Sequence, residues 1–474
     1  MDHLPLIGGV HRDCELEAVH NPWSGEITSE IGQTSPSMID EALDASVEGF
    51  YALRDLQPYQ RADILEKMAI GVGENKVLLS DAILREAGKP TCYAEGEVDR
   101  CIQTFQRSAE AARDSGQTSI PLNAVEAGHG RTGLVERFPR GPVLAITPFN
   151  FPLNLVAHKI GPAIAAGCSF IVKPAEQTPT PALILGRIAQ EAGCPPQAVN
   201  ILPAHRSRAA QLVEDPRPKV LSFTGSDRVG WMLKSQAGKK KVLLELGGNA
   251  AAIVHDDANL DLAVPLIVGG AYAYAGQVCI SVQRVLIHES RYAEARDRII
   301  DEVSNVATGN PEDPSVTCGP LIHPSAKTRI LQWEKEALDA GGKRTFAQPE
   351  PDNPSLLSPR IFETVPRHSK LYQEEVFGPV MMLESYSTLA EAIALVNDSR
   401  WGLQAGFFGE KLPEVFQAFR QLEVGALFHN DIPTRRVDHM PYGGVKDSGL
   451  GREGPTWAME DYTEPRMLAI RWGT

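Results

Sequence analysis

The sequence predicts an α/β protein built on a mostly parallel sheet, and three observations support this fold class. Short apolar segments recur between positions 140 and 255, each with the length of a buried strand. Segments of helical length separate them, and strands that alternate with helices form βαβ units with parallel strands. A chain of 474 residues favours two or three domains over a single core. The expected strands are 143–147, 169–174, 199–204, 220–226 and 241–248.

Helices are expected between these strands. Residues 152–167 have a helical pattern, and a second helix carries its own start and stop signals. Thr180 is the expected N-cap of that helix, Pro181 its first helical position and Gly193 its end. This arrangement is typical of nucleotide-binding folds, in which ligands bind beyond the carboxyl ends of the strands.

Two further regions are expected outside this sheet. A second α/β region begins near residue 244 and runs to about 440. The segments 130–147 and 466–474 have the pattern of long strands, and the latter is expected to add an edge strand to another body.

Composition excludes several classes of function. The net charge of −14 argues against a nucleic-acid or anionic-membrane surface, since either needs clustered Lys and Arg. The apolar runs 160–172 and 262–276 are too short to span a bilayer, and the first ten residues lack the basic region of a signal peptide. Seven scattered cysteines without a C-x-x-C pair predict reduced thiols in a cytoplasmic protein. Twelve histidines without H-x-x-H spacing predict no metal site.

Cys279, in "GQVCIS", is the first candidate for chemistry. It follows a long run of small residues, and small residues permit close approach of the backbone and of a flat ligand. A thiolate is a good nucleophile, whereas most buried cysteines act as small hydrophobes. The local sequence leaves both interpretations open.

Glu245 and Asn150 are further candidates. Glu245 ends an apolar strand directly before Gly247 and Gly248, where a carboxylate is costly to bury unless it is paired, solvated or functional. Such a group suits a general base for water, although an exposed acid at the end of a strand is an equal alternative. Asn150 lies between two phenylalanines, and its amide can donate to a developing oxyanion.

The cofactor candidates follow strands. Lys173 and Glu176 lie where the ribose of a cofactor binds in a doubly wound sheet, although by themselves they are also typical of a solvated strand end. A carboxylate binds a ribose 2′-hydroxyl and repels a 2′-phosphate, so Glu176 favours NAD over NADP. Gly225 and Gly230 open a helix and can offer backbone N–H groups to a pyrophosphate, although two glycines alone are a weak signal.

Seven motifs then occur in one order along the chain. The motifs are "PFNFP" (148–152), "KPAEQTP" (173–179), "FTGS" (223–226), "LELGG" (244–248), "GQVC" (276–279), "EEVFGPV" (374–380) and "PYGGVKDSGLGREG" (441–454). Together they resemble the aldehyde dehydrogenase superfamily over essentially the whole sequence. The segment "NDIPTRRVDHMPYGG" resembles its lactaldehyde and glyceraldehyde-type branch, which includes enzymes for phosphonate- or sulfonate-bearing aldehydes.

The resemblance implies an NAD(P)-dependent oxidation of an aldehyde to a carboxylic acid. Cys279 would attack the aldehyde to give a thiohemiacetal, hydride would pass to the nicotinamide, and water activated by Glu245 would hydrolyse the thioester. Asn150 and the backbone N–H of Cys279 would hold the oxyanion. Lys173 would belong to both the catalytic and the cofactor-binding residues. The implied cofactor-binding residues are Thr147, Pro148, Phe149, Lys173, Glu176, Gly225, Ser226, Gly230, Leu246, Gly247, Glu375 and Phe377.

The resemblance also implies an organisation of the chain. A Rossmann-type NAD-binding domain would comprise 1–116 and 138–243, an α/β catalytic domain 244–440, and a small β oligomerisation arm 117–137 and 455–474. The arm would make a homodimer or homotetramer. NAD is the expected cofactor, with NADP possible, and the expected partner is a small-molecule aldehyde.

The substrate side depends on four residues. His158 and Arg436 occupy positions where relatives often carry aromatic residues, Tyr442 keeps an aromatic ring, and Arg100 is expected to line the pocket from a preceding helix. An imidazole and a guanidinium suit a hydroxylated or anionic aldehyde, such as lactaldehyde, glyceraldehyde, a phosphonate- or sulfonate-aldehyde or a semialdehyde. The alternative is that Arg436 pairs with Asp438 or a surface acid and never meets substrate. The alternative that the residue does not meet substrate also stays open for His158 and Arg100.

Two rival functions stay open. A CoA-acylating relative would pass the thioester to coenzyme A, and Glu245 argues against it because a resident water activator would compete. A non-catalytic relative would serve as a binding or structural protein, and the presence of Cys279, Glu245 and Asn150 together argues against that.

Overall fold

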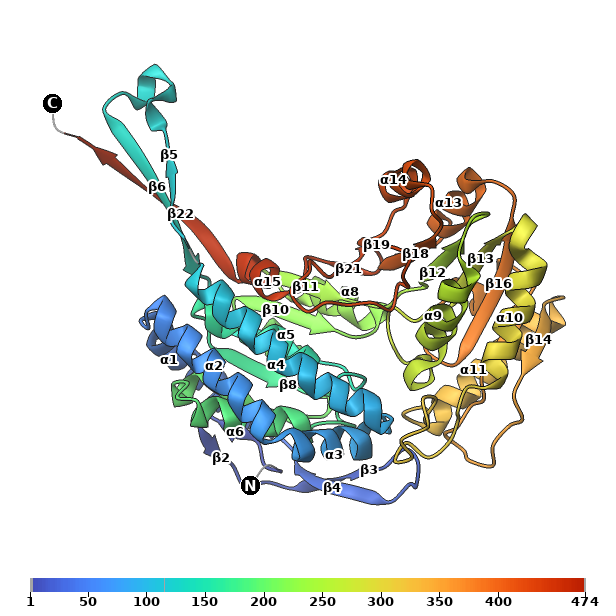
Figure 1. Cartoon of the computed structure of the whole chain (residues 1–474). Coiled ribbons are helices and arrows are strands. Elements are labelled where there is room, and N and C mark those ends of the chain that lie inside the picture. The colour runs from blue at the N-terminus through green and yellow to red at the C-terminus, as the bar shows by residue number, and fades with distance from the viewer. Residues whose placement is uncertain (1–2, 115, 473–474) are drawn as a thin grey trace.

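The computed structural model describes residues 3–114 and 116–472. Two large sheets lie side by side, and a three-stranded arm projects from the side of the first sheet (Figure 1). Positions 1, 2 and 115 of the predicted NAD-binding region and positions 473 and 474 of the predicted tail strand lie outside the described residues. No helix in the described part of the chain is long and apolar enough to cross a membrane.

The first sheet has a central parallel core with antiparallel strands at both edges. The order places β7 between β8 and β10, so the chain builds one half of the sheet outward from β7 and then returns to build the other half. In order, its strands are β2 (Val10–His11), β1 (Leu6–Ile7), β9 (Val199–Ile201), β8 (Phe170–Lys173), β7 (Val143–Ile146), β10 (Val220–Thr224), β11 (Lys241–Glu245) and β21 (Gly449–Leu450).

Helices cover both faces of this sheet because its strands alternate between two apolar cores. Val143 and Ala145 of β7 pack in one core, whereas Leu144 and Ile146 pack in the other. The first core is shared with α2 (Pro58–Glu74), α3 (Lys76–Ala87), α4 (Thr91–Arg113), α5 (Asn154–Ala166), α6 (Thr180–Glu191) and α15 (Pro455–Tyr462). The second is shared with α1 (Pro36–Arg54), α7 (Ala209–Glu214) and α8 (Asp227–Gln236).

Side chains along the strands of the second sheet also alternate between two helix layers. Ala252 and Val254 of β12 face one helix layer, and Ala251 and Ile253 face the other. Its strands, in order, are β14 (Lys343–Ala347), β15 (Arg360–Glu363), β16 (Val380–Tyr386), β13 (Arg284–His288), β12 (Ala251–Val254), β18 (Gln404–Phe408) and β19 (Ala426–His429). Its helices are α9 (Leu260–Tyr272), α10 (Tyr292–Ser304), α11 (Pro324–Asp339), α12 (Lys370–Gln373), α13 (Leu389–Asn397) and α14 (Leu412–Gln421).

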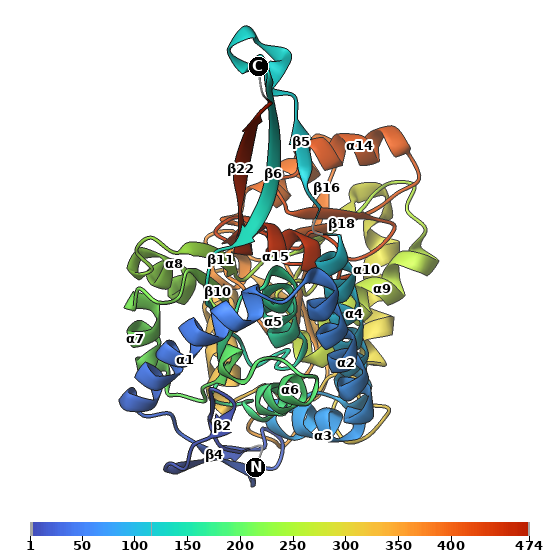
Figure 2. The ribbon, with the colours of Figure 1, turned by 90° about the vertical axis from the view of Figure 1, so that its left-hand side faces the viewer.

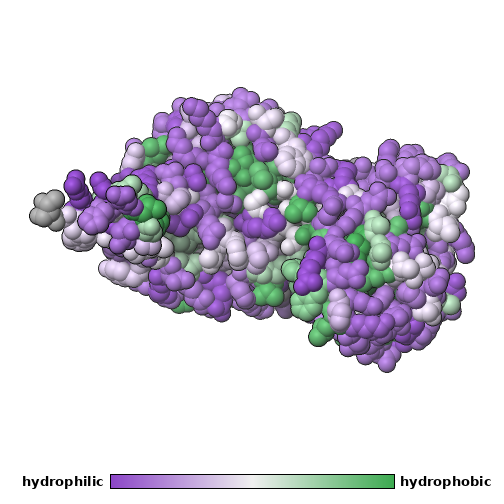
Figure 3. Space-filling view, turned by 90° about the horizontal axis from the view of Figure 1, so that it is seen from above, coloured by the Kyte–Doolittle hydropathy of each residue, from purple (hydrophilic) through white to green (hydrophobic). Residues whose placement is uncertain are grey.

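The arm consists of β5 (Thr118–Ile120), β6 (Arg131–Pro139) and β22 (Thr463–Arg471). β22 pairs antiparallel with β6 along its whole length (Figure 2). Met467 and Leu468 are 57% and 60% exposed. Figure 3 shows hydrophobic side chains on the arm that the described residues leave uncovered.

Most of the predicted local structure is confirmed. The five predicted strands of the first sheet are β7, β8, β9, β10 and β11, and residues 466–471 join the arm as part of β22. The predicted N-cap is wrong by one position: Thr180 is already the first residue of α6, and its hydroxyl donates to buried Glu86 instead of capping the helix.

Candidate active site

A cavity of about 670 Å³ lies between the two sheets. β7 and β10 are the strands at which the order of the first sheet reverses, and the residues after both strands line the cavity. Such a crevice is where open α/β sheets bind ligands, and the volume suits a small molecule or cofactor. The second sheet closes it with the turn before β13, which carries Cys279.

Cys279 is positioned by a left-handed turn after α9. Tyr274, Ala275 and Gly276 have φ values of 51°, 54° and 69°. For the two residues with a Cβ, this conformation costs about 1–2 kcal/mol each. Gly276 is required because a Cβ there would lie 2.3 Å from the carbonyl oxygen of Gly378. The turn reverses the chain so that Cys279 faces the cavity before β13 begins.

The Cys279 sulfur has one polar partner among the described residues. It lies 2.9 Å from the hydroxyl of Tyr442, and either group can donate. Burial raises the pKa of the Cys279 thiol to about 12, and the Tyr442 hydrogen bond opposes that rise. The resting thiol is therefore protonated at neutral pH, and groups that favour the thiolate control its reactivity.

Asn150 follows β7 and lines the same cavity. Its side-chain amide is buried and donates to the carbonyl oxygen of Gln277, two residues before Cys279, at 3.0 Å. This hydrogen bond fixes the amide beside the loop that carries the sulfur.

Glu245 ends β11 and is buried in the cavity wall. Neither carboxylate oxygen accepts a hydrogen bond from any described residue. Burial raises the pKa of Glu245 well above its ordinary value, and the charge of Glu453 adds to the effect. Gly443 leaves space for the carboxyl group, since a Cβ there would lie 2.7 Å from Oε1 of Glu245. A buried acceptor without a partner, facing a cavity, is suited to hold water.

Glu453, which was not among the residues predicted from the sequence, carries the negative charge that raises the pKa of Glu245 in addition to burial. It accepts from Lys159 at 2.8 Å and from Arg436 at 3.0 Å, and all three side chains are at most 7% exposed. Although burial opposes ionisation, these two cations lower the pKa of Glu453 to about 2. Glu453 thus stays charged and makes ionisation of Glu245 harder.

The structure brings most of the predicted cofactor residues to one side of the cavity. The rings of Phe149 and Phe377 meet edge to face at 5.9 Å, and Glu375 accepts from the backbone N–H of Gly248 at 3.2 Å. Burial raises the pKa of Glu375 to about 8. Gly247 permits this approach, since a Cβ there would lie 2.4 Å from Oε2 of Glu375. The predicted residues that line the cavity are Pro148, Phe149, Gly225, Ser226, Leu246, Gly247, Glu375 and Phe377.

Four predicted cofactor residues do not line this cavity. Thr147 and Lys173 are buried at the ends of β7 and β8, and the backbone N–H of Thr147 donates to the carbonyl oxygen of Lys173 at 3.2 Å. The carboxylate of Glu176 accepts from the backbone N–H of Arg206. Gly230 packs against Leu246 inside α8. Their roles toward a cofactor stay predictions.

Three of the four predicted substrate residues line the cavity. They are Arg100, Arg436 and Tyr442. The guanidinium of Arg436 lies 3.7 Å from the ring centroid of Tyr442, and its Nε–H has no partner among the described residues. Arg436 pairs with Glu453, and it is Arg100 that pairs with Asp438, at 2.7 Å.

The position of His158 in the structure corrects the prediction that this residue contacts substrate. It is fully buried in α5, outside the cavity lining, and its Nε2 lies 2.8 Å from Asp438. Burial, with the nearby Arg436, lowers the pKa of His158 and favours the neutral ring. Although burial acts against it, the hydrogen bonds from His158 and Arg100 hold the pKa of Asp438 well below its ordinary value. His158 therefore supports the residue that holds Arg100.

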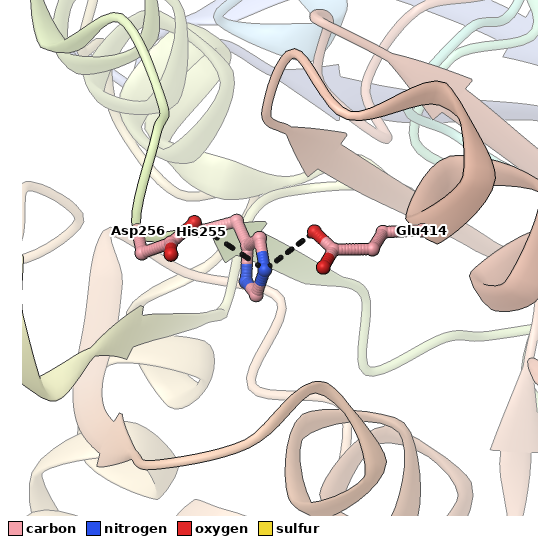
Figure 4. A group of neighbouring side chains, drawn as sticks. All are labelled: His255, Asp256 and Glu414. Carbon is pink, nitrogen blue, oxygen red and sulfur yellow. Dashed lines mark ion pairs between the residues drawn. The ribbon is translucent and has the colours of Figure 1, made fainter.

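One group of potential metal ligands lies elsewhere in the described residues. His255 directly follows the last residue of β12, whereas Glu245 precedes the first residue of that strand. The Nε2 of His255 lies 2.8 Å from Glu414 and 3.5 Å from Asp256 (Figure 4). Lys411 already pairs with Asp256 at 2.9 Å. The ammonium supplies the positive charge for these acids, so the group forms an ion-pair network.

Comparisons with known proteins agree with this geometry. Residues 11–468 match the aldehyde dehydrogenase family. A 3-sulfolactaldehyde dehydrogenase from Priestia aryabhattai is 38% identical over 459 residues, which cover 96% of this chain and 95% of that protein. Among solved structures, aldehyde dehydrogenase 21 from Physcomitrella patens, in complex with the reaction product succinate, is 39% identical with a TM-score of 0.97, covering 99% of this chain and 98% of that one.

A further solved structure contains a cofactor. Glyceraldehyde-3-phosphate dehydrogenase GapN from Methanocaldococcus jannaschii, complexed with NADP, is 34% identical with a TM-score of 0.92, covering 98% of this chain and all of that one. These findings confirm the predicted fold and the predicted NAD(P)-dependent oxidation of an aldehyde. The chain belongs to the aldehyde dehydrogenase family.

Proposed function

We propose that this chain oxidises a small polar or anionic aldehyde to its carboxylic acid through a thiohemiacetal and a thioester on Cys279. The observation that carries the proposal is the convergence of three distant segments on one cavity. The Cys279 sulfur, the Asn150 amide and the unpartnered carboxyl group of Glu245 all line it. A nucleophile, an oxyanion donor and a water-binding base are the groups that acyl transfer through cysteine requires.

In the first step the thiolate of Cys279 bonds to the carbonyl carbon. The Asn150 amide, with the backbone N–H of Cys279, stabilises the resulting oxyanion. When the hydride leaves this carbon, the C=O bond re-forms and the thioester on Cys279 results, and NAD(P) would supply the hydride acceptor. Because the resting thiol is protonated, the donor hydroxyl of Tyr442 and the charge of Arg436 favour the thiolate that the step needs.

In the second step water hydrolyses the thioester. Glu245 takes a proton from the water, whose oxygen bonds to the acyl carbon while the carbon–sulfur bond breaks. The Cys279 sulfur leaves as thiolate, and the released carboxylic acid loses its proton to solvent. The raised pKa of Glu245 makes it a stronger base for this transfer once it is ionised.

The residues of the cavity fit a dinucleotide. Gly225 and Ser226 follow β10 before α8, where backbone N–H groups suit a pyrophosphate. Glu375 and Phe377 would hold the nicotinamide ribose and ring, and Lys173 with Glu176 the adenosine ribose. The carboxylate of Glu176 favours NAD, and NADP stays possible.

Arg436 is the proposed anchor for an anionic or hydroxyl group of the substrate. Its side chain is 7% exposed and keeps one N–H without a protein partner, which suits an oxygen acceptor. Arg100 adds a second cation in the cavity wall. The sulfonate in the name of one relative and the succinate bound in another agree with an anionic substrate, whether a sulfonate, phosphonate or carboxylate.

The organisation of the chain follows from the same proposal. Residues 1–116 and 138–243 would bind the cofactor, 244–440 would carry the catalytic loop, and 117–137 with 455–474 would assemble a homodimer or homotetramer in the cytoplasm. The exposed apolar side chains of β22 support assembly through the arm. All seven cysteines are free, as expected for a reducing compartment.

The test is a panel of aldehydes that carry hydroxyl, carboxylate, phosphonate or sulfonate groups, with a neutral aldehyde as reference. We expect Arg436→Gln to lower kcat/KM about 10- to 100-fold more for the anionic members than for the neutral one. Arg435→Gln is the matched control, since Arg435 is exposed and pairs with Asp431. An equal loss across the panel would remove the anchor role.

Product analysis separates the rival functions. Carboxylate formed without coenzyme A supports hydrolysis, whereas turnover that requires coenzyme A and yields an acyl-CoA contradicts it. A chain that turns over no aldehyde and whose Cys279 is not protected from alkylation by NAD(P) would be a non-catalytic relative.

A further inference from the structure

Lys89 and Glu97 form a buried ion pair in the wall of the active-site cavity. Lys89 follows α3 and Glu97 lies in α4, and both side chains have no exposed surface. Both line the cavity, as Asn150 and Cys279 do. A buried ion pair gives little net stability, because desolvation offsets its attraction. Fold stability alone therefore does not account for a charged pair at this place.

Glu97 binds the start of the helix that follows the Asn150 loop. Its Oε1 accepts from the backbone N–H groups of Leu153 and Asn154 at 2.9 and 3.0 Å. These N–H groups begin α5, and Leu153 at the N-cap has no side chain that can accept them. Glu97 thus caps α5 from another helix, three residues after the predicted oxyanion donor.

Lys89 contacts both the Asn150 loop and the nucleophile loop. Its ammonium lies 3.7 Å from the ring centroid of Phe151, which directly follows Asn150. It lies 4.8 Å from the ring centroid of Tyr274, the first residue of the left-handed turn before Cys279. The hydroxyl of Tyr274 also donates to the carbonyl oxygen of Ala87, two residues before Lys89, at 3.0 Å.

We infer that Lys89 and Glu97 are positioning residues that fix the Asn150 amide relative to the Cys279 sulfur. Glu97 holds the helix behind Asn150, and Lys89 holds Glu97 together with the two aromatic rings. This inference rests on the proposed function, because it assigns the pair to the oxyanion-forming step. A displacement of about 1 Å between reacting groups can cost about 100-fold in rate.

The test is the double variant Lys89→Met/Glu97→Gln, which removes both charges and keeps an amide oxygen for the two N–H groups of α5. We expect the single-turnover rate of NAD(P)H formation and kcat to fall about 10- to 100-fold, with KM and cofactor affinity near those of the wild type. Glu334→Gln/Arg360→Met, in another buried ion pair, is the matched control and should keep wild-type rates.

A second comparison separates positioning from general damage. In an Asn150→Ala background the double variant should cause less than a threefold further loss, because its effect acts through Asn150. The full loss in that background would overturn the inference, as would wild-type rates in the double variant. If the double variant does not fold, Glu97→Gln alone is compared in the same two backgrounds. Absence of oxidation in the wild type would instead refute the proposed function.

Discussion

Tyr442→Phe isolates the one polar contact that the structure gives to the Cys279 sulfur. The substitution removes a hydroxyl 2.9 Å from the sulfur and leaves the buried ring in place. The Tyr442 hydrogen bond lowers the thiol pKa against the larger effect of burial. Its loss therefore raises the pKa, and less thiolate is present at any pH below it.

The magnitude follows from the pKa of the Cys279 thiol and the strength of the hydrogen bond to it. With a pKa of about 12, about one thiol in 10,000 is ionised at pH 8 in the ligand-free protein. A hydrogen bond to a charged group contributes about 1.5–3 kcal/mol. Since about 1.4 kcal/mol corresponds to a factor of ten, Tyr442→Phe should lower the thiolate fraction about 10- to 100-fold.

The assay is the rate of alkylation of Cys279 by iodoacetamide between pH 7 and 10, read by peptide mass spectrometry. Both proteins should show a rate that rises tenfold per pH unit, and the variant should lie below the wild type by the same factor throughout. Exposed Cys92 provides an internal reference whose rate should not change. Equal Cys279 rates in the two proteins would refute the assigned contact.

Three further variants test other parts of the structure. Cys279→Ala should abolish aldehyde oxidation and leave NAD(P) affinity, measured by calorimetry, unchanged. Glu453→Gln removes a charge that raises the pKa of Glu245, so the acidic limb of the kcat–pH profile should move to lower pH. The same substitution leaves the buried cations Lys159 and Arg436 without the carboxylate with which both pair, so the free energy of unfolding should fall by about 3–5 kcal/mol. Replacement of both Met467 and Leu468 by Asp should convert the assembly to a smaller species, and light scattering measures its mass.

For each of these three variants, one result would contradict the expectation. Residual turnover in Cys279→Ala would place the nucleophile elsewhere. An acidic limb in Glu453→Gln that stays in place or moves to higher pH would contradict the electrostatic effect on Glu245. An unchanged mass after both arm substitutions would show that other surfaces hold the assembly.

The first sheet was predictable because its signals are local. Each strand from β7 to β11 is a short apolar run between helical segments, and alternation along a strand follows from burial on two faces. The motifs around Cys279, Glu245 and Asn150 were likewise continuous stretches of sequence, and the structure brings all three to one cavity.

The contacts between charges were not predictable, because the partners lie far apart in the chain. Lys159 and Glu453 are separated by 294 positions, and Arg100 and Asp438 by 338. Only the folded chain shows which acid compensates which buried cation. The alternative that Arg436 pairs with Asp438 or a surface acid was wrong for this reason, since buried Glu453 is the acid that faces Arg436.

Two other features had no signal in local sequence. α5 is buried all around, so helical periodicity does not tell which face meets the cavity, and His158 points instead to Asp438. Tyr274 and Ala275 adopt a left-handed conformation that their residue types disfavour. Tertiary contacts impose that turn, among them the Tyr274 hydroxyl on Ala87.

The most direct test of the central claim is intact-protein and peptide mass spectrometry of Glu245→Gln after mixing with NAD(P) and an aldehyde substrate. We expect one equivalent of NAD(P)H per active site in a single burst, followed by an adduct of acyl mass on Cys279 that persists because water is not activated. An adduct on another residue, or steady turnover at the wild-type rate without any adduct, would contradict the shared site of sulfur, amide and water-activating acid.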